Sequence, residues 1–217
     1  MKRLVVLIGF LITLGAYLAS TLKVPSVKID EPGSTHKSTP TYTTTDEDNE
    51  SIGVVSEQLG HSVNLDWPPI HLAVDHGDRE KLLALLEAGA DTESRIEGGF
   101  TALYQAVDRK RPDLIGPLLN YGANPSAPAA SGWTPLHCAA IDAPIEIINA
   151  FIEADANLDL KNDNGHTPLH IAAVNENLNC IKALLDGGSD RTIQDNEGLK
   201  AENLSESESI QSLFTSP

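Results

Sequence analysis

The feature that most constrains this chain is a segment that recurs at an interval of 33 residues. Residues 132–140 read GWTPLHCAA, and residues 165–173 read GHTPLHIAA. The same interval reaches earlier copies at Trp67 and Gly99 and a degenerate later copy at Gly198. A fixed period of roughly 20–50 residues is typical of proteins built from stacked units, because one such unit cannot bury its apolar face alone. The repeat therefore predicts a solenoid.

The second half of each copy is predicted to be helical. Apolar residues fall at positions i, i+1 and i+4, as in Leu114, Ile115 and Leu118, which places them on one face of a helix. A residue suited to a left-handed helix terminus follows each of these stretches. These residues are Gly89, Gly122, Asp155 and Gly188.

Residues 62–214 closely resemble the ankyrin-repeat family, whose mark is a T-P-L-H-x-A motif on a period of about 33 residues. The resemblance implies an all-α solenoid of four helix-turn-helix repeats plus a degenerate C-terminal cap, with a hairpin or turn protruding from each repeat. The expected boundaries are about 66–98, 99–131, 132–164 and 165–197, with the cap at 198–214. Such a module is expected to bind a protein through its hairpin edge and its concave face.

Two further segments are expected before the repeat domain, which we assign to residues 62–217. In residues 1–28, Lys2 and Arg3 precede an uncharged apolar run long enough to span a bilayer. This run is read as a membrane anchor that leaves the repeats outside the cytoplasm; the alternative is a cleaved signal peptide and a periplasmic or secreted product. Residues 29–61, rich in Ser, Thr, Pro and acidic side chains, are expected to form a disordered stalk.

Charge and motif content narrow the function. The formal net charge of −16 disfavours nucleic acid as a partner. No catalytic or phosphate-binding motif is present, so we expect a monomeric interaction module that is not an enzyme and needs no cofactor. The alternative function is an inhibitor or immunity-type partner of an exported enzyme.

Histidine and cysteine receive structural interpretations. His71, His137 and His170 occur once per copy, so stacking separates them and they are not expected to form a metal site. The resemblance implies that each links neighbouring turns, with Thr134 and Thr167 beside the last two. Cys138 and Cys180 align with apolar positions of other copies and are expected to be inert core residues.

One row of side chains is a candidate binding surface. The residue before the threonine position of the motif is aromatic in most copies, and stacking aligns equal positions along one edge. This row consists of Trp67, Phe100, Trp133, His166 and Leu199. Aromatic residues are favoured interface anchors, which makes the first four members candidate partner contacts. The alternative is that each ring packs over the neighbouring turn.

Two features of the second repeat stand out. Arg109, Lys110 and Arg111 form the one basic triplet of the repeat region, and they either contact an acidic patch of a partner or are neutralised by Asp75, Asp78 or Asp142. Pro117 lies inside the second helix of this repeat, which predicts a kinked or shortened helix.

Overall fold

The described part of the protein, residues 67–215 of a computed structural model, consists mainly of short helices that occur in pairs. The segments assigned to residues 1–28 and 29–61 lie outside these residues. Within 67–215, none of the helices combines the length and the apolar character needed to cross a membrane. The paired helices are α2 (Pro69–His76) with α3 (Arg79–Glu87), α4 (Ala102–Asp108) with α5 (Pro112–Asn120), α6 (Pro135–Asp142) with α7 (Ile145–Glu153), and α8 (Pro168–Val174) with α9 (Leu178–Asp186).

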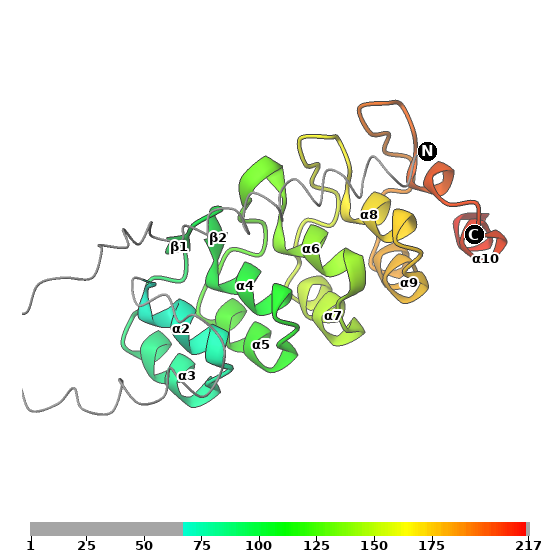
Figure 1. Cartoon of the computed structure of the whole chain (residues 1–217). Coiled ribbons are helices and arrows are strands. Elements are labelled where there is room, and N and C mark those ends of the chain that lie inside the picture. Colours follow the sequence, from blue (N-terminus) through cyan, green and yellow to red (C-terminus); the bar gives the residue numbers. More distant parts are fainter. Residues whose placement is uncertain (1–66, 216–217) are drawn as a thin grey trace, which may run out of the picture. The chain divides into compact units, whose positions relative to one another are not determined.

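The pairs stack in the order of the sequence. In each step the first helix of a pair packs on the first helix of the next, and α3, α5, α7 and α9 follow one another in the same way (Figure 1). The short 3-10 helix η2 (Ala201–Leu204) packs on α8, and α10 (Glu208–Thr215) packs on α9. This arrangement confirms the helix-turn-helix architecture that the repeat predicted.

The loops that join successive pairs differ in their local structure. Strands β1 (Arg95–Ile96) and β2 (Phe100–Thr101) form an antiparallel hairpin in the first loop, which is a small departure from the all-α prediction. The second loop contains the 3-10 helix η1 (Ala130–Gly132), and the fourth contains an isolated bridge between Gln194 and Lys200.

Local sequence signals set the helix boundaries. Thr134 and Thr167 are the N-cap residues of α6 and α8, and each forms a capping box with the histidine three positions later. The residue types that follow α3, α5, α7 and α9 were predicted to be left-handed, and the prediction is confirmed. The φ angles are 82° at Gly89, 85° at Gly122, 51° at Asp155 and 93° at Gly188.

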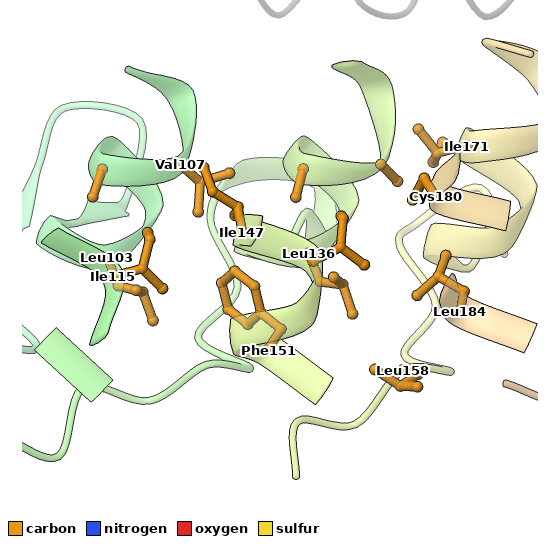
Figure 2. Close-up of a cluster of buried hydrophobic side chains, with 14 of the residues drawn as sticks. Leu103, Val107, Ile115, Leu136, Ile147, Phe151, Leu158, Ile171, Cys180 and Leu184 are labelled. Carbon is orange, nitrogen blue, oxygen red and sulfur yellow. The ribbon is translucent and has the colours of Figure 1, made fainter. Parts of the chain in front are cut away.

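A continuous apolar core runs through the stack. Side chains of Leu103, Ile115, Leu136 and Phe151 from neighbouring pairs point toward one another, and each is at most 1% exposed (Figure 2). Burying each such side chain contributes about 1.5–3 kcal/mol, so the core supplies the main driving force for stacking. At the start of the stack the polar Lys81 is exposed at the position that Leu114, Ile147 and Cys180 fill as buried residues in later pairs. Within residues 67–215, the apolar layers therefore begin at α2–α3.

Of the two predicted effects of Pro117, a kinked or a shortened helix, the shortened helix is wrong, and the kink stays a prediction. Helix α5 has 9 residues, the same length as α3, α7 and α9. Pro117 lies near the middle of α5, four residues after the exposed Asp113, and it has no N–H to donate to the carbonyl of that residue. The buried side chains Leu114, Ile115 and Leu118 pack the helix against the core.

Candidate protein-binding edge

The four loops that follow α3, α5, α7 and α9 lie side by side along one edge of the stack (Figure 1). We call residues 89–100, 122–133, 155–166 and 188–199 the hairpin edge. Single backbone hydrogen bonds join the loops: Ala130 N–H donates to Gly98 O at 3.1 Å, Asp163 N–H to Ser131 O at 3.1 Å, and Asn196 N–H to Asn164 O at 3.2 Å. Because the tips are joined, side chains at equal positions of the repeats form fixed rows.

Two cations strengthen this edge, and sequence reasoning missed both. Arg95 Nη1 donates to Gly99 O at 2.8 Å and to Pro128 O at 2.6 Å, and Lys161 Nζ donates to Gln194 O at 2.8 Å. Positions 95, 128, 161 and 194 are 33 residues apart, so each cation reaches the carbonyl of the equivalent residue in the next loop. The 33-residue spacing of these four positions was the sequence signal that could have predicted both contacts.

The motif histidines hold the later loops to the helices. His137 Nε2 donates to His166 O at 2.9 Å, while its Nδ1 accepts from Thr134 N–H at 3.2 Å and lies 2.8 Å from the Thr134 hydroxyl. His170 repeats the pattern with Thr167 and reaches Leu199 O at 3.1 Å. The predicted structural role of these two histidines is confirmed. We call this arrangement the histidine bridge.

Burial keeps the bridging histidines neutral. It lowers the pKa of His137 to about 4 and also lowers the pKa of His170. The Nδ1 atoms of His137 and His170 accept from the backbone N–H groups of Thr134 and Thr167. A proton on either Nδ1 would therefore point at another donor. The bridge is therefore formed by the neutral imidazole.

The first two helix pairs depart from this pattern. His71 lies at the same position but contacts Ser94 O and Gln105 Oε1, each at 2.9 Å. Within the described residues, the buried amide nitrogen of Gln105 has no hydrogen-bond partner. Tyr104 replaces the histidine in α4, where its ring lies 4.6 Å from that of Phe100 and its side chain is hydrogen-bonded to Cys138. The loop after α5 therefore has no histidine bridge.

The candidate row of rings lies along the inner margin of the hairpin edge, and its members are half-buried rather than fully exposed. Each ring pairs with the ring four positions later: centroids are 6.5 Å apart for Trp67 and His71, 5.8 Å for Trp133 and His137, and 5.8 Å for His166 and His170. Trp133 also packs against the core. These contacts show that the rings pack on their own repeats and leave part of each ring accessible; partner binding by the row stays a prediction.

The basic triplet lies in the turn between α4 and α5, and its first two members form ion pairs with the neighbouring helix pairs. Arg109 Nη2 lies 2.8 Å from Asp75 Oδ1, and Lys110 Nζ lies 2.7 Å from Asp142 Oδ2. The guanidinium of Arg111 lies against Gly77. This agrees with neutralisation by neighbouring carboxylates; a role in partner contact stays a prediction.

Both cysteines are free thiols of low reactivity. Burial raises the pKa of both Cys138 and Cys180 to about 12, so neither is a thiolate at neutral pH. In residues 67–215, no three His, Cys, Asp or Glu side chains converge as metal ligands would.

Stacked helix pairs whose loops form one continuous edge define a repeat solenoid. Residues 103–195 match the family model described as ankyrin repeats (3 copies). This segment therefore consists of ankyrin repeats, which supports the resemblance found in the sequence. A search of the curated proteins found no match for the chain.

Proposed function

We propose that this protein is a monomeric ankyrin-repeat module of four repeats plus a C-terminal cap, and that it binds a protein partner through its hairpin edge and concave face. Ankyrin repeats are protein-interaction scaffolds, which supports the coarse function. The observation that carries the choice of surface is the fixed row of half-buried rings beside loops that are joined tip to tip. A preformed edge loses little conformational entropy when it binds.

The proposal includes a location outside the cytoplasm. The basic start and apolar run of residues 1–28 support a membrane anchor, with a cleaved signal and a periplasmic or secreted product as the alternative. Residues 29–61 would then separate the repeats from the membrane. Fractionation with intact-mass measurement tests this part: a soluble product lacking about twenty residues would replace the anchor with the signal peptide. No observation favours the inhibitor or immunity-type alternative.

Site-directed cross-linking tests the binding surface on the full chain. A photo-reactive phenylalanine analogue at position 100 should yield a discrete protein adduct in the native host, whereas the same analogue at position 149, exposed on α7, should not. Adducts from both positions, or from neither, would contradict the proposed surface.

Once the adduct is identified, Trp133→Ala should weaken its binding by about 2 kcal/mol, because aromatic anchors carry a large share of interface energy. The Trp133 ring is half-buried, so the variant must be shown by circular dichroism to remain folded. If Trp133→Ala unfolds the domain while a folded Phe100→Ala variant binds normally, the rings are packing residues and the concave helices become the candidate surface.

A further inference from the structure

The second loop of the hairpin edge differs chemically from its neighbours. Residues 122–133 contain no charged side chain, whereas the loops on both sides contain several carboxylates. The contrast is sharpest in one row of equal positions, where exposed Ala130 lies between exposed Glu97 and exposed Asp163. Backbone hydrogen bonds from Ala130 to Gly98 and from Asp163 to Ser131 fix this order along the edge.

The apolar centre of the edge includes the ring of Phe100, at the end of the first loop, and the ring of Trp133, at the end of the second. Phe100 lies over Gly98, whose missing side chain leaves room for the ring, and Trp133 follows η1 directly. Pro128 and Ala130 are exposed between them. A partner therefore meets an uncharged patch of rings, proline and alanine at the middle of the edge.

The carboxylates that flank this patch take no part in the ion pairs of the described residues. None of the ion pairs among residues 67–215 involves Glu97, Asp163 or Glu197. The cations nearest in sequence, Arg95 and Lys161, already donate to loop carbonyls. The flanks of the edge are therefore negative, in a chain whose net charge is −16.

We propose that the hairpin edge binds a basic protein segment, with apolar side chains on Phe100, Trp133 and loop 122–133 and with flanking Lys or Arg side chains at Glu97 and Asp163. This inference rests on the proposed function and names the chemistry of its partner. Charge complementarity accelerates encounter and excludes acidic competitors, while the apolar centre supplies contact area. An acidic partner would bring like charges together at both flanks.

The test uses the full chain in detergent micelles and three synthetic peptides. The first has a central pair of phenylalanines between lysine runs, the second has glutamates in place of the lysines, and the third has serines in place of the phenylalanines. Calorimetry at about 0.15 M salt should show that the first peptide binds at least about tenfold more tightly than either of the others. Equal binding of the first and third, or of the first and second, overturns the proposal.

Matched variants separate a local site from attraction to the total charge. The pair Glu97→Gln with Asp163→Asn should weaken binding of the lysine–phenylalanine peptide about tenfold, because both flanking contacts are lost. The control pair Glu146→Gln with Glu153→Gln removes the same charge from exposed positions of α7 and should change binding less than about twofold. Equal losses in both pairs would show non-specific attraction and overturn the proposal.

The experiments distinguish an error in the basic partner from an error in the proposed binding edge. If the glutamate peptide binds most tightly and Trp133→Ala weakens it, the edge is a binding surface and the basic partner is wrong. If no peptide binds and position 100 yields no adduct in the native host, the binding edge itself is wrong.

Discussion

The helix pairs α4–α5 and α6–α7 occupy equal places inside the stack, yet they hold their loops by different means. In α6, His137 joins Thr134 to His166 O across the following loop. In α4, Tyr104 takes the same position and interacts with Phe100 and Cys138 instead.

The loop contacts show the same contrast. The loop after α7 is joined to the next loop by Lys161, by the Asp159 carboxylate and by two bonds from Asn196. Among the described residues, one hydrogen bond, from Asp163 to Ser131, joins the loop after α5 to the loop after α7. Equal repeats therefore need not be equally secured. The second loop, which is the centre of the candidate binding edge, has three hydrogen bonds to the loop after α3 but one to the loop after α7.

The largest expected effect is the loss of stability when the buried leucine that both pairs carry at the same position is truncated. Leu136→Ala and Leu103→Ala each remove a fully buried side chain between stacked helices and should lower the free energy of unfolding by about 2–5 kcal/mol. We expect the Leu136 variant to lose more, because its pair is tied to the next loop by the histidine bridge. Urea denaturation of both variants measures the difference. An unchanged midpoint for Leu136→Ala would contradict the assigned register.

Acidification should weaken the bridged region selectively. Burial lowers the pKa of His137 to about 4, whereas the unfolded histidine titrates near 6.5. Between these values the unfolded state binds more protons, so stability present above pH 6.5 is lost as the pH falls toward 4.

At pH 5 the loss from His137 alone should be about 2 kcal/mol, whereas Tyr104 stays neutral because burial raises its pKa. Urea midpoints at pH 7 and pH 5, compared between the parent and His137→Gln, measure the effect. The same pH dependence in both proteins would show that His137 is not responsible.

Exchanging Tyr104 and His137 should reduce the difference in stability between the pairs α4–α5 and α6–α7. Tyr104→His places an imidazole beside Thr101, whose hydroxyl already caps α4, and allows a bond to Trp133 O; at pH 7 this should add about 1 kcal/mol. His137→Tyr should cost about 1–3 kcal/mol, since His166 O loses one of its two donors and keeps only the backbone N–H of Asn162.

Hydrogen exchange localises these changes. In the parent we expect amides of α4–α5 and the loop 122–133 to exchange faster than those of α6–α9, and Tyr104→His should slow them. If α4–α5 is the better protected pair in the parent, the comparison is wrong.

The smallest effect should come from the ion pair between the two regions. Lys110 and Asp142 join the turn after α4 to the end of α6, but their side chains are 47% and 65% exposed. Lys110→Ala should therefore change the free energy of unfolding by less than about 1 kcal/mol and lose its effect in high salt. A larger, salt-independent loss would indicate that the basic triplet secures the stack.

The sequence by itself determined the stack, because periodicity, caps and helix ends are local. A 33-residue interval, Thr-Pro starts and Gly or Asp stops place the helix pairs without any long-range information. Even Asp155, the one such stop that is not glycine, was predictable from the conformations its side chain tolerates. The predicted effect of Pro117 on helix length was wrong, because the local cost of an interior proline can be outweighed by the burial of Leu114, Ile115 and Leu118, which the local sequence does not weigh.

Tertiary structure decided how the repeats are joined and how much of the candidate site is accessible. Interactions such as Arg95 with Pro128 O, Arg109 with Asp75 and Lys110 with Asp142 depend on which surfaces stacking brings within about 3 Å. The half-burial of the ring row has a local part, because each ring lies close to the ring four positions later, and a tertiary part, because Trp133 also packs against the core of the stack. A repeating pattern shows which positions align, but the fraction of a ring left for a partner depends on the neighbours packed against it.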